Sequence, residues 1–191
     1  ADASSAAFVG LDGLTLAAGD ISVIVNKVAD DGSTLDFSTT ALTVATGPTS
    51  STDLTMDGSR GNIEEIRGDL TIDVAGFVSL SGTFAFGRTV QGATSEFIGM
   101  GENITASLNV SDSIYVRSEG ANFGLFSNSD GELAFELSDG NLALQLGPLA
   151  NVSADSILIQ YTNASTTVSA GGDAKTISAA GLTYTFDEEI A

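Results

Sequence analysis

The sequence predicts an all-β fold, and three observations support this prediction. Apolar and polar residues alternate with period two along most of the chain, which places the apolar side chains on one face of each expected strand. Asp-Gly pairs, which supply the backbone conformation of tight turns, recur between the alternating segments. The segments follow one another about every 8–12 residues, a spacing typical of all-β domains.

The alternation defines the expected strands in chain order. They are Ile21–Val25, Leu70–Val74, Val78–Phe86, Ile114–Val116, Leu133–Leu137, Leu142–Leu146, Ile157–Tyr161 and Leu182–Phe186. Turns are expected at 30–33, 57–59, 128–131, 138–141 and 171–173, and one or two helical turns at Gly61–Arg67, with a weaker helical candidate at Ser4–Val9. This pattern predicts an elongated molecule of many short strands, in a β-solenoid-like or stacked two-sheet arrangement, with a compact β-sandwich as the alternative.

Two segments near the end of the chain echo two segments near its start. Leu14–Asn26 is echoed at Ala150–Tyr161, and Phe37–Val44 is echoed at Ile177–Tyr184, about 136 to 140 residues downstream and in the same order. We expect a single all-β unit over 1–191, and the echoes suggest about 1.4 copies of a repeat of roughly 140 residues, divided as 1–136 and 137–191. Since the identity is low, chance similarity between β segments is the other explanation.

Composition excludes several classes of function. The chain has 25 Asp and Glu against 6 Lys and Arg, a formal net charge of -19, whereas binding to nucleic acid requires clustered basic residues. It contains neither Cys nor His, so thiol nucleophiles, soft-metal sites and triads that contain His cannot be built. No long apolar run is present, so we expect no insertion into a membrane.

Acidic turns are the candidate metal sites. Hard cations with oxygen ligands, Ca²⁺ above all, are the cofactors that the residue types still allow. The candidate ligands are Asp30, Asp31, Asp57, Asp130, Glu132 and Asp139. The alternative is a set of solvated turns in which Asp was selected for its backbone preference. We expect no other cofactor.

Adjacent carboxylates do not predict an enzyme. Glu64 and Glu65 could suggest the acid pair of a glycoside hydrolase, as could the acidic run 187–189. Neighbouring residues on a strand point to opposite faces, however, and therefore cannot flank one bond. The chain also contains no Trp to form a sugar-binding platform. We therefore expect a protein without catalytic activity.

One stretch of the chain resembles a known class of repeats. Val74–Phe86, with the sequence VAGFVSLSGTFAF, resembles a phrase in tandem β-repeat regions of giant secreted bacterial proteins of the adhesin and calcium-binding haemolysin-like type. Asn103–Leu108, Phe123–Phe135 and Gly147–Leu149 are similar to the pieces that follow it. The resemblance implies a secreted or cell-surface location in a bacterium, and tandem repetition. The Gly-Gly-x-Gly-x-Asp nonapeptides of calcium-binding β-rolls are absent, so calcium binding by that mechanism is not implied.

The leading functional hypothesis is a non-enzymatic extracellular structural repeat module of a giant surface or matrix protein. Its partners would be neighbouring repeats or copies of itself. The first alternative is a self-assembling subunit of an extracellular filament or surface layer. The second alternative is a module that binds a glycan or another ligand.

Overall fold

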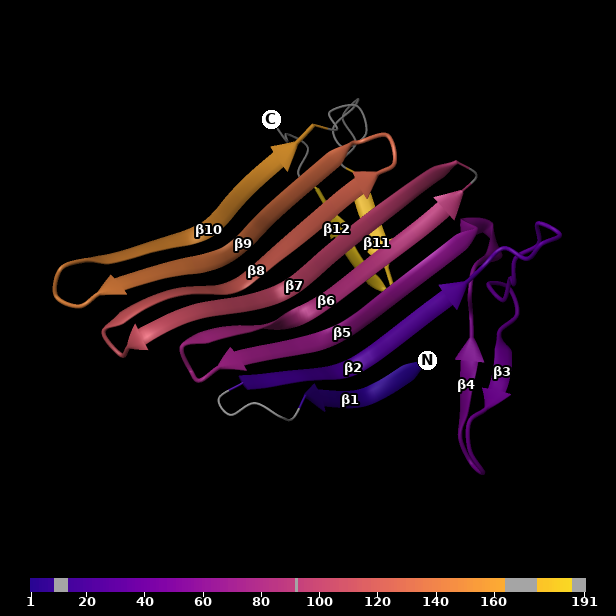
Figure 1. Cartoon of the computed structure of the whole chain (residues 1–191), viewed down its shortest axis with the longest axis horizontal. Helices are drawn as coiled ribbons and strands as arrows, with labels where there is room; N and C mark the ends of the chain where they lie inside the picture. The colour runs from indigo at the N-terminus through magenta and orange to yellow at the C-terminus, as the bar shows by residue number, and fades with distance from the viewer. Residues whose placement is uncertain (9–13, 92, 164–174, 187–191) are drawn as a thin grey trace.

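A large antiparallel sheet dominates the molecule, and the all-β prediction is confirmed. The computed structural model describes residues 1–8, 14–91, 93–163 and 175–186. The large sheet has eight strands, which lie side by side in the order in which they follow one another along the chain, with β5 next to β2 (Figure 1). They are β1 (Asp2–Phe8), β2 (Leu14–Asn26), β5 (Asn62–Val74), β6 (Val78–Gln91), β7 (Thr94–Ser111), β8 (Ile114–Asn128), β9 (Leu133–Leu146) and β10 (Asn151–Thr162).

Two small sheets accompany the large one. β3 (Leu42–Ala45) pairs with β4 (Ser51–Leu54) beyond the end of β2, and β11 (Thr176–Ala179) pairs with β12 (Leu182–Thr185). The β11–β12 hairpin lies across one face of β5, β6, β7 and β8 (Figure 1). The molecule is therefore a stack of two sheets only where this hairpin covers the large sheet. The large sheet itself is a meander of adjacent antiparallel strands and does not form the coils of a solenoid.

The strands are longer than the sequence predicted, and two local expectations are wrong. The expected turn at 138–141 lies inside the 14-residue strand β9, where Asp139 and Gly140 have φ of 62° and 66°. The positive φ of the Asp-Gly pair thus forms an irregularity within a strand instead of a hairpin. The expected helix at Gly61–Arg67 is the start of β5, preceded by one 3-10 turn at Gly58–Arg60. The described part of the candidate Ser4–Val9 belongs to β1, and Val9 lies outside the described residues.

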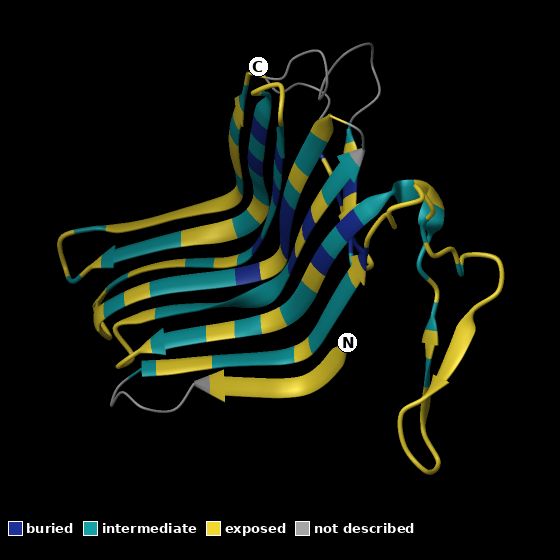
Figure 2. Ribbon diagram, turned by 45° about the vertical axis from the view of Figure 1, so that its right-hand side comes forward, coloured by how far each residue is buried: buried dark blue, intermediate teal, exposed yellow. Residues whose placement is uncertain are grey.

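The large sheet bends sharply about halfway along its strands (Figure 2). Residues with positive φ interrupt neighbouring strands at the bend. They are Asp20 (48°), Asn103 (52°), Gly120 (74°), Asp139 (62°), Gly140 (66°) and Ser156 (62°). The pairing changes register here too, for example between Gly19 and Ser22 and between Gly101 and Ile104. Because a bulge bends its strand and increases its twist, a row of bulges bends the whole sheet.

The core lies between the β11–β12 hairpin and the sheet. Its buried side chains are Ala85, Met100, Phe126, Ala134, Ile177, Ala179, Leu182, Tyr184 and Phe186. The alternation of β12 is complete, with Leu182 and Tyr184 buried and Thr183 and Thr185 exposed. Small residues in the sheet make room for the hairpin, since a Cβ at Gly124 would overlap the ring of Tyr184.

The opposite side of the sheet, which we call the open face, carries apolar residues toward both ends of the strands. The pairing aligns Ile66 with Phe86 near one end of the strands and Val74, Val78 and Leu108 near the other. Within the described part of the chain no second layer covers this face. Ile104 and Ala121 are nevertheless only 8% and 2% exposed, because they lie inside the bend.

Candidate functional site

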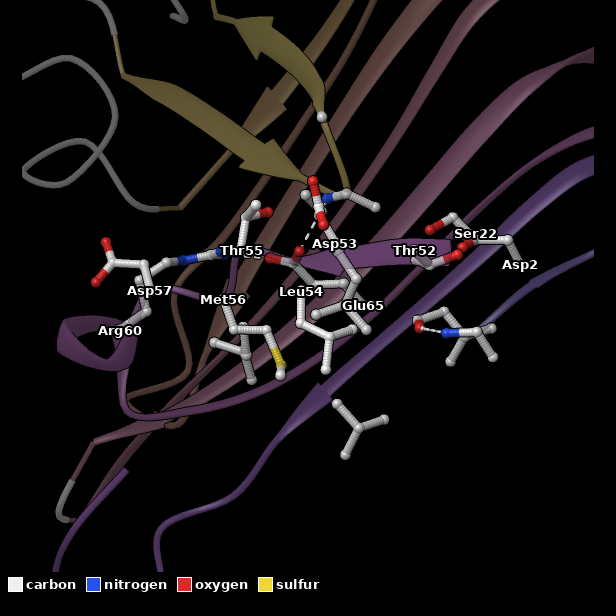
Figure 3. A pocket seen from close by; sticks show the side chains of 18 of the residues that line it. Asp2, Ser22, Thr52, Asp53, Leu54, Thr55, Met56, Asp57, Arg60 and Glu65 are labelled. Carbon is white, nitrogen blue, oxygen red and sulfur yellow. Dashed lines mark hydrogen bonds and ion pairs between the residues drawn. The ribbon is translucent and has the colours of Figure 1, made fainter. Parts of the chain in front are cut away.

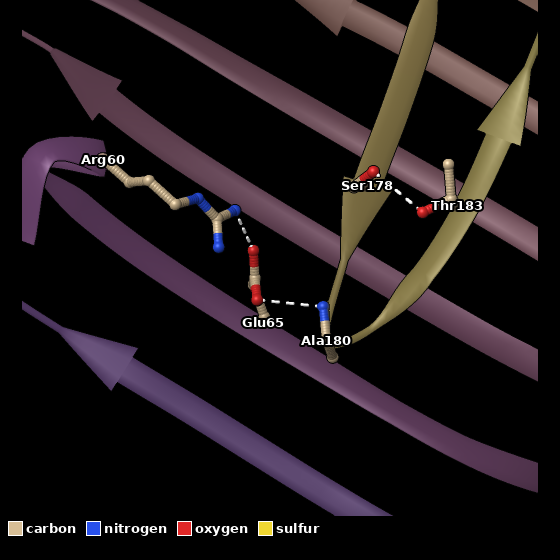
Figure 4. A network of polar contacts seen from close by, with 5 residues as sticks. All are labelled: Arg60, Glu65, Ser178, Ala180 and Thr183. Atoms are coloured by element: carbon tan, nitrogen blue, oxygen red, sulfur yellow. Dashed lines mark hydrogen bonds and ion pairs between the residues drawn. The ribbon is translucent and has the colours of Figure 1, made fainter. Parts of the chain in front are cut away.

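A buried glutamate holds the tip of the β11–β12 hairpin. Glu65, on β5, has a side chain that is 2% exposed and forms an ion pair with Arg60. Its second carboxylate oxygen accepts a hydrogen bond of 2.9 Å from the backbone N–H of Ala180 (Figure 4). Ala180 and Gly181, the two residues of the turn, have φ of 46° and 82°, as a type I′ hairpin requires. The glutamate thus anchors the hairpin turn to the sheet.

A second buried glutamate holds the other end of the hairpin. The Tyr184 hydroxyl donates to Glu136 Oε1 at 2.6 Å, and Gln160 Nε2 donates to Glu136 Oε2 at 2.8 Å. The Tyr184 hydroxyl also lies 3.0 Å from Ser138 Oγ. Burial raises the pKa of Tyr184, and the hydrogen bond to Glu136 raises it further. The phenol therefore stays neutral and serves as a donor. Neither Glu136 nor Tyr184 was singled out from the sequence.

A cavity of about 860 Å³ lies beside the Glu65 anchor, between β2, β5, the β4 segment and the hairpin tip (Figure 3). Two of the carboxylates that line it have local partners. Asp53 accepts a hydrogen bond of 2.6 Å from Thr43, and Asp57 accepts one of 2.8 Å from the backbone N–H of Ser59. Glu64, next to Glu65 in sequence, lies on the opposite face and contacts Lys27 at 3.1 Å. The structure therefore does not bring Glu64 and Glu65 together; 187–189 lies outside the described residues.

The carboxylates predicted as calcium ligands lie in separate parts of the fold. Asp30 and Asp31 belong to the turn after β2, where Asp31 accepts hydrogen bonds from both the N–H and the hydroxyl of Ser33, at 2.9 and 2.6 Å. Both bonds lower the pKa of Asp31, the hydroxyl bond more strongly. Asp57 caps the 3-10 turn. Asp31 and Asp57 thus organise their own turns, as side chains of Asp commonly do.

The other predicted ligands lie near β9. Asp130 and Glu132 occupy the β8–β9 turn, where Glu132 accepts a hydrogen bond of 2.7 Å from Asn128. Asp139 lies at the bend and accepts one of 2.9 Å from Asn122 on β8. Among the residues that the structure describes, no group of three or more Asp and Glu is placed to hold a metal ion. Calcium binding therefore stays a prediction.

The open face presents many exposed apolar side chains. Its exposed members include Ile66, Val74, Val78, Phe86, Phe97, Leu108, Val116, Leu146, Val152, Ile159 and Tyr161. Aromatic rings line the end of this face near the β8–β9 turn, with centroid separations of 6.2 Å for Phe84 and Phe123 and 6.4 Å for Phe123 and Phe135. Contiguous apolar patches of this kind usually mark interaction surfaces.

The first and last hairpins of the large sheet have the same geometry. Adding 136 to both members of the β1–β2 pairs Asp2↔Ser22, Ala3↔Ile21 and Ser5↔Gly19 gives the β9–β10 pairs Ser138↔Leu158, Asp139↔Ile157 and Asn141↔Asp155. The same shift relates the two bulges, since Asp20 and Ser156 have φ of 48° and 62°. Pairing and bulge position are separate observations, and both agree with the shift of the first sequence echo.

The edges of the sheet are the candidate site for interaction. Within the described residues, β1 and β10 are the edge strands of the large sheet, and each pairs with a neighbouring strand on one side only. Unpaired strands present a row of backbone N–H and C=O groups that can pair with another strand. β10 contains no Lys, Arg or Pro, the residues that commonly protect an edge.

Comparison with known proteins adds no assignment, because no family model, curated protein or solved structure matches this chain. Among the described residues, no helix is long and apolar enough to cross a membrane.

Proposed function

We propose that this chain is a non-enzymatic structural module of a tandem array, serving as a stalk or matrix component of a large secreted surface protein. The repeated hairpin carries the proposal. If β9–β10 is the next occurrence of β1–β2, the strands β5 to β10 form one period of a sheet that continues from one repeat to the next. The partners of the module are then its neighbouring repeats, and its function is to extend and stiffen the array.

The composition supports an extracellular setting for this role. A chain without Cys depends on no redox environment, and its high negative charge opposes non-specific association. The two buried glutamates also fit a structural role, since their hydrogen bonds fasten the hairpin to the sheet. The resemblance of Val74–Phe86 to repeats of giant secreted proteins points in the same direction.

A self-assembling subunit is the second candidate, and the open face favours it. Ile159 and Tyr161 are 53% and 54% exposed on this face, and two copies that met there would bury an apolar surface on each. Self-assembly would make the same surface the joint of a filament or surface layer.

Light scattering on the purified chain distinguishes the two candidates. The tandem-module proposal predicts a monomer both in millimolar Ca²⁺ and with a chelator, since its neighbours are covalently linked. Growth into large species in either condition would contradict it and favour the self-assembling subunit. A variant with Ile159→Lys on the open face is the control, because it should abolish growth that depends on this face and leave a monomer unchanged.

A further inference from the structure

The free edge of β10 corresponds to an edge of β2 that is already paired with another strand in the structure. β2 occupies the position that corresponds to β10 under the shift of 136 residues, and β2 pairs with β5 along its other edge. We infer that the edge of β10 binds a strand equivalent to β5 from the following repeat, in the register that β5 adopts on β2. This inference rests on the proposed function and specifies its interface.

The register follows from the β2–β5 pairing. Ala17 pairs with Thr71, so Ser153 of β10 pairs with the residue that is equivalent to Thr71 in the next repeat. In the same way Leu16 pairs with Ile72, so Val152 pairs with the residue equivalent to Ile72. Val23 pairs with Ile66, so Ile159 pairs with the residue equivalent to Ile66. Val152 and Ile159 thus meet apolar positions of the incoming strand, whereas Tyr161, the counterpart of Val25, meets the Glu64 position.

Exposure supports this assignment. Val152 and Ile159 are each 53% exposed at the edge, whereas the β2 counterpart of Val152, Leu16, is 37% exposed beside Ile72. Val23, the counterpart of Ile159, is half-buried beside Ile66. A β5-like strand would cover both residues of β10 to a similar extent, and the burial of apolar area would stabilise the junction.

The bulge of β10 matches the shape that β5 requires. On β2 the pairing with β5 shifts between Gly19 and Ser22, around the positive φ of Asp20. Ser156 has the same conformation at the corresponding place in β10. The edge is therefore already shaped to receive a strand that crosses the bend, which lowers the cost of association.

A duplicated chain places the incoming strand in reach. The second sequence echo has a shift of 140 residues, so the residue after Ala191 in a tandem array corresponds to residue 52. The full chain is therefore continued after Ala191 with a second copy of residues 52–191. Ser153→Cys in the first copy is combined with Thr71→Cys in the second, in a chain that otherwise contains no Cys. Both residues are exposed in the single chain, so neither substitution disturbs the core.

The register variant and the folding control use the same strand. In the register variant, Asp73→Cys replaces Thr71→Cys, which moves the thiol two residues along the same face. In the folding control, Ala17→Cys and Thr71→Cys both lie in the first copy, where the structure pairs them directly. Disulfides form only within a narrow range of Cα separations, so cross-linking reports the register.

The expected result is a disulfide for Ser153→Cys with Thr71→Cys at a rate close to the folding control, and several-fold slower cross-linking for the Asp73→Cys pair. Equal rates for the two pairs, or cross-links between separate chains, would overturn the inference. If the control itself does not cross-link, the full single chain with Ser153→Cys is mixed with a synthetic peptide of residues 62–74. The Thr71→Cys peptide must then cross-link faster than the Asp73→Cys peptide, and failure there also overturns the inference.

The two proposals fail in different ways. Growth of the unmodified single chain in light scattering would refute the tandem-module function, whatever the register of the engineered junction. A monomeric single chain whose duplicated form does not cross-link in register would remove the β10–β5 junction and the continuous sheet, and would leave standing only the role as a structural module of a tandem array.

Discussion

Removal of the Tyr184 hydroxyl tests how firmly the hairpin is fastened to the sheet. In Tyr184→Phe the ring stays and continues to pack, but the donor to Glu136 at 2.6 Å and the contact with Ser138 at 3.0 Å are lost. Hydrogen bonds to charged groups typically contribute about 1.5–3 kcal/mol, and we expect the free energy of unfolding to fall by that amount. For a chain of this size the corresponding drop in Tm is about 3–12 °C.

Urea unfolding followed by far-UV circular dichroism measures this loss. Urea is preferred to guanidinium because the latter is a salt and would screen the charge of -19. Ser178→Ala is the matched control, since Ser178 contacts Thr183 on the exposed side of the same hairpin and its loss should cost less than about 0.5 kcal/mol. A double-mutant cycle with Glu136→Gln should give a coupling of about 0.5–3 kcal/mol. A Tyr184→Phe variant as stable as the control would refute the role of this bond.

Three further predictions follow from the hairpin and from the charge. Gly124→Ala should destabilise the chain by about 1–3 kcal/mol in urea unfolding, because the new methyl group overlaps the Tyr184 ring; Gly19→Ala, whose nearest contact would be Ser4 O at 3.7 Å, should be neutral or stabilising, and equal effects of the two would contradict the packing. The pKa of Tyr184 is raised in the folded chain, so the unfolded chain releases the phenol proton at a lower pH, and the stability that this group contributes should be full below about pH 10 and fall above it. The Tyr184→Phe variant should therefore lose less stability between pH 9 and pH 11. Identical pH profiles of stability for the two chains would argue against a neutral buried phenol. Raising the salt concentration from about 0.01 M to about 0.15 M shortens the screening length from about 30 Å to about 8 Å, so the Tm should rise as repulsion among the acidic residues weakens; a falling Tm in calorimetry would show that ion pairs dominate instead.

The strands could be predicted from the sequence because alternation is a local signal. Leu70–Val74 and Val78–Phe86 lie in β5 and β6, as expected, and the turn at 128–131 joins β8 to β9. Strand length was harder to predict, because the positive φ of Asp139 and Gly140 serves a bulge as well as a hairpin turn. Only the pairing of β9 with β8 and β10 decides between the two.

The helical expectation at Gly61–Arg67 failed because Ile63 and Ile66 have a spacing that also fits one helical turn. In β5 these two residues lie on opposite faces, Ile63 toward the hairpin and Ile66 on the open face, so both faces of the sheet are apolar here. Strict alternation is lost where both faces of a strand are apolar, and the local pattern then no longer identifies the strand.

The anchors of the hairpin could not be predicted, because they join residues far apart in the sequence. Glu65 bonds to Ala180 at a separation of 115 residues, and Tyr184 bonds to Glu136 at a separation of 48. The sequence echo of Leu42–Val44 and Leu182–Tyr184 gives no hint of their different environments. β3 is exposed at every position, whereas Leu182 and Tyr184 are buried against the sheet.

Hydrogen–deuterium exchange along β10 tests whether the sheet continues from one repeat to the next. In the single chain, the backbone N–H groups of Asn151–Thr162 that point away from β9 are expected to exchange rapidly. In the chain continued with a second copy of residues 52–191, these groups are expected to become protected together with residues 62–74 of the second copy. Unchanged rapid exchange along β10 in a duplicated chain whose other strands are protected would contradict this expectation.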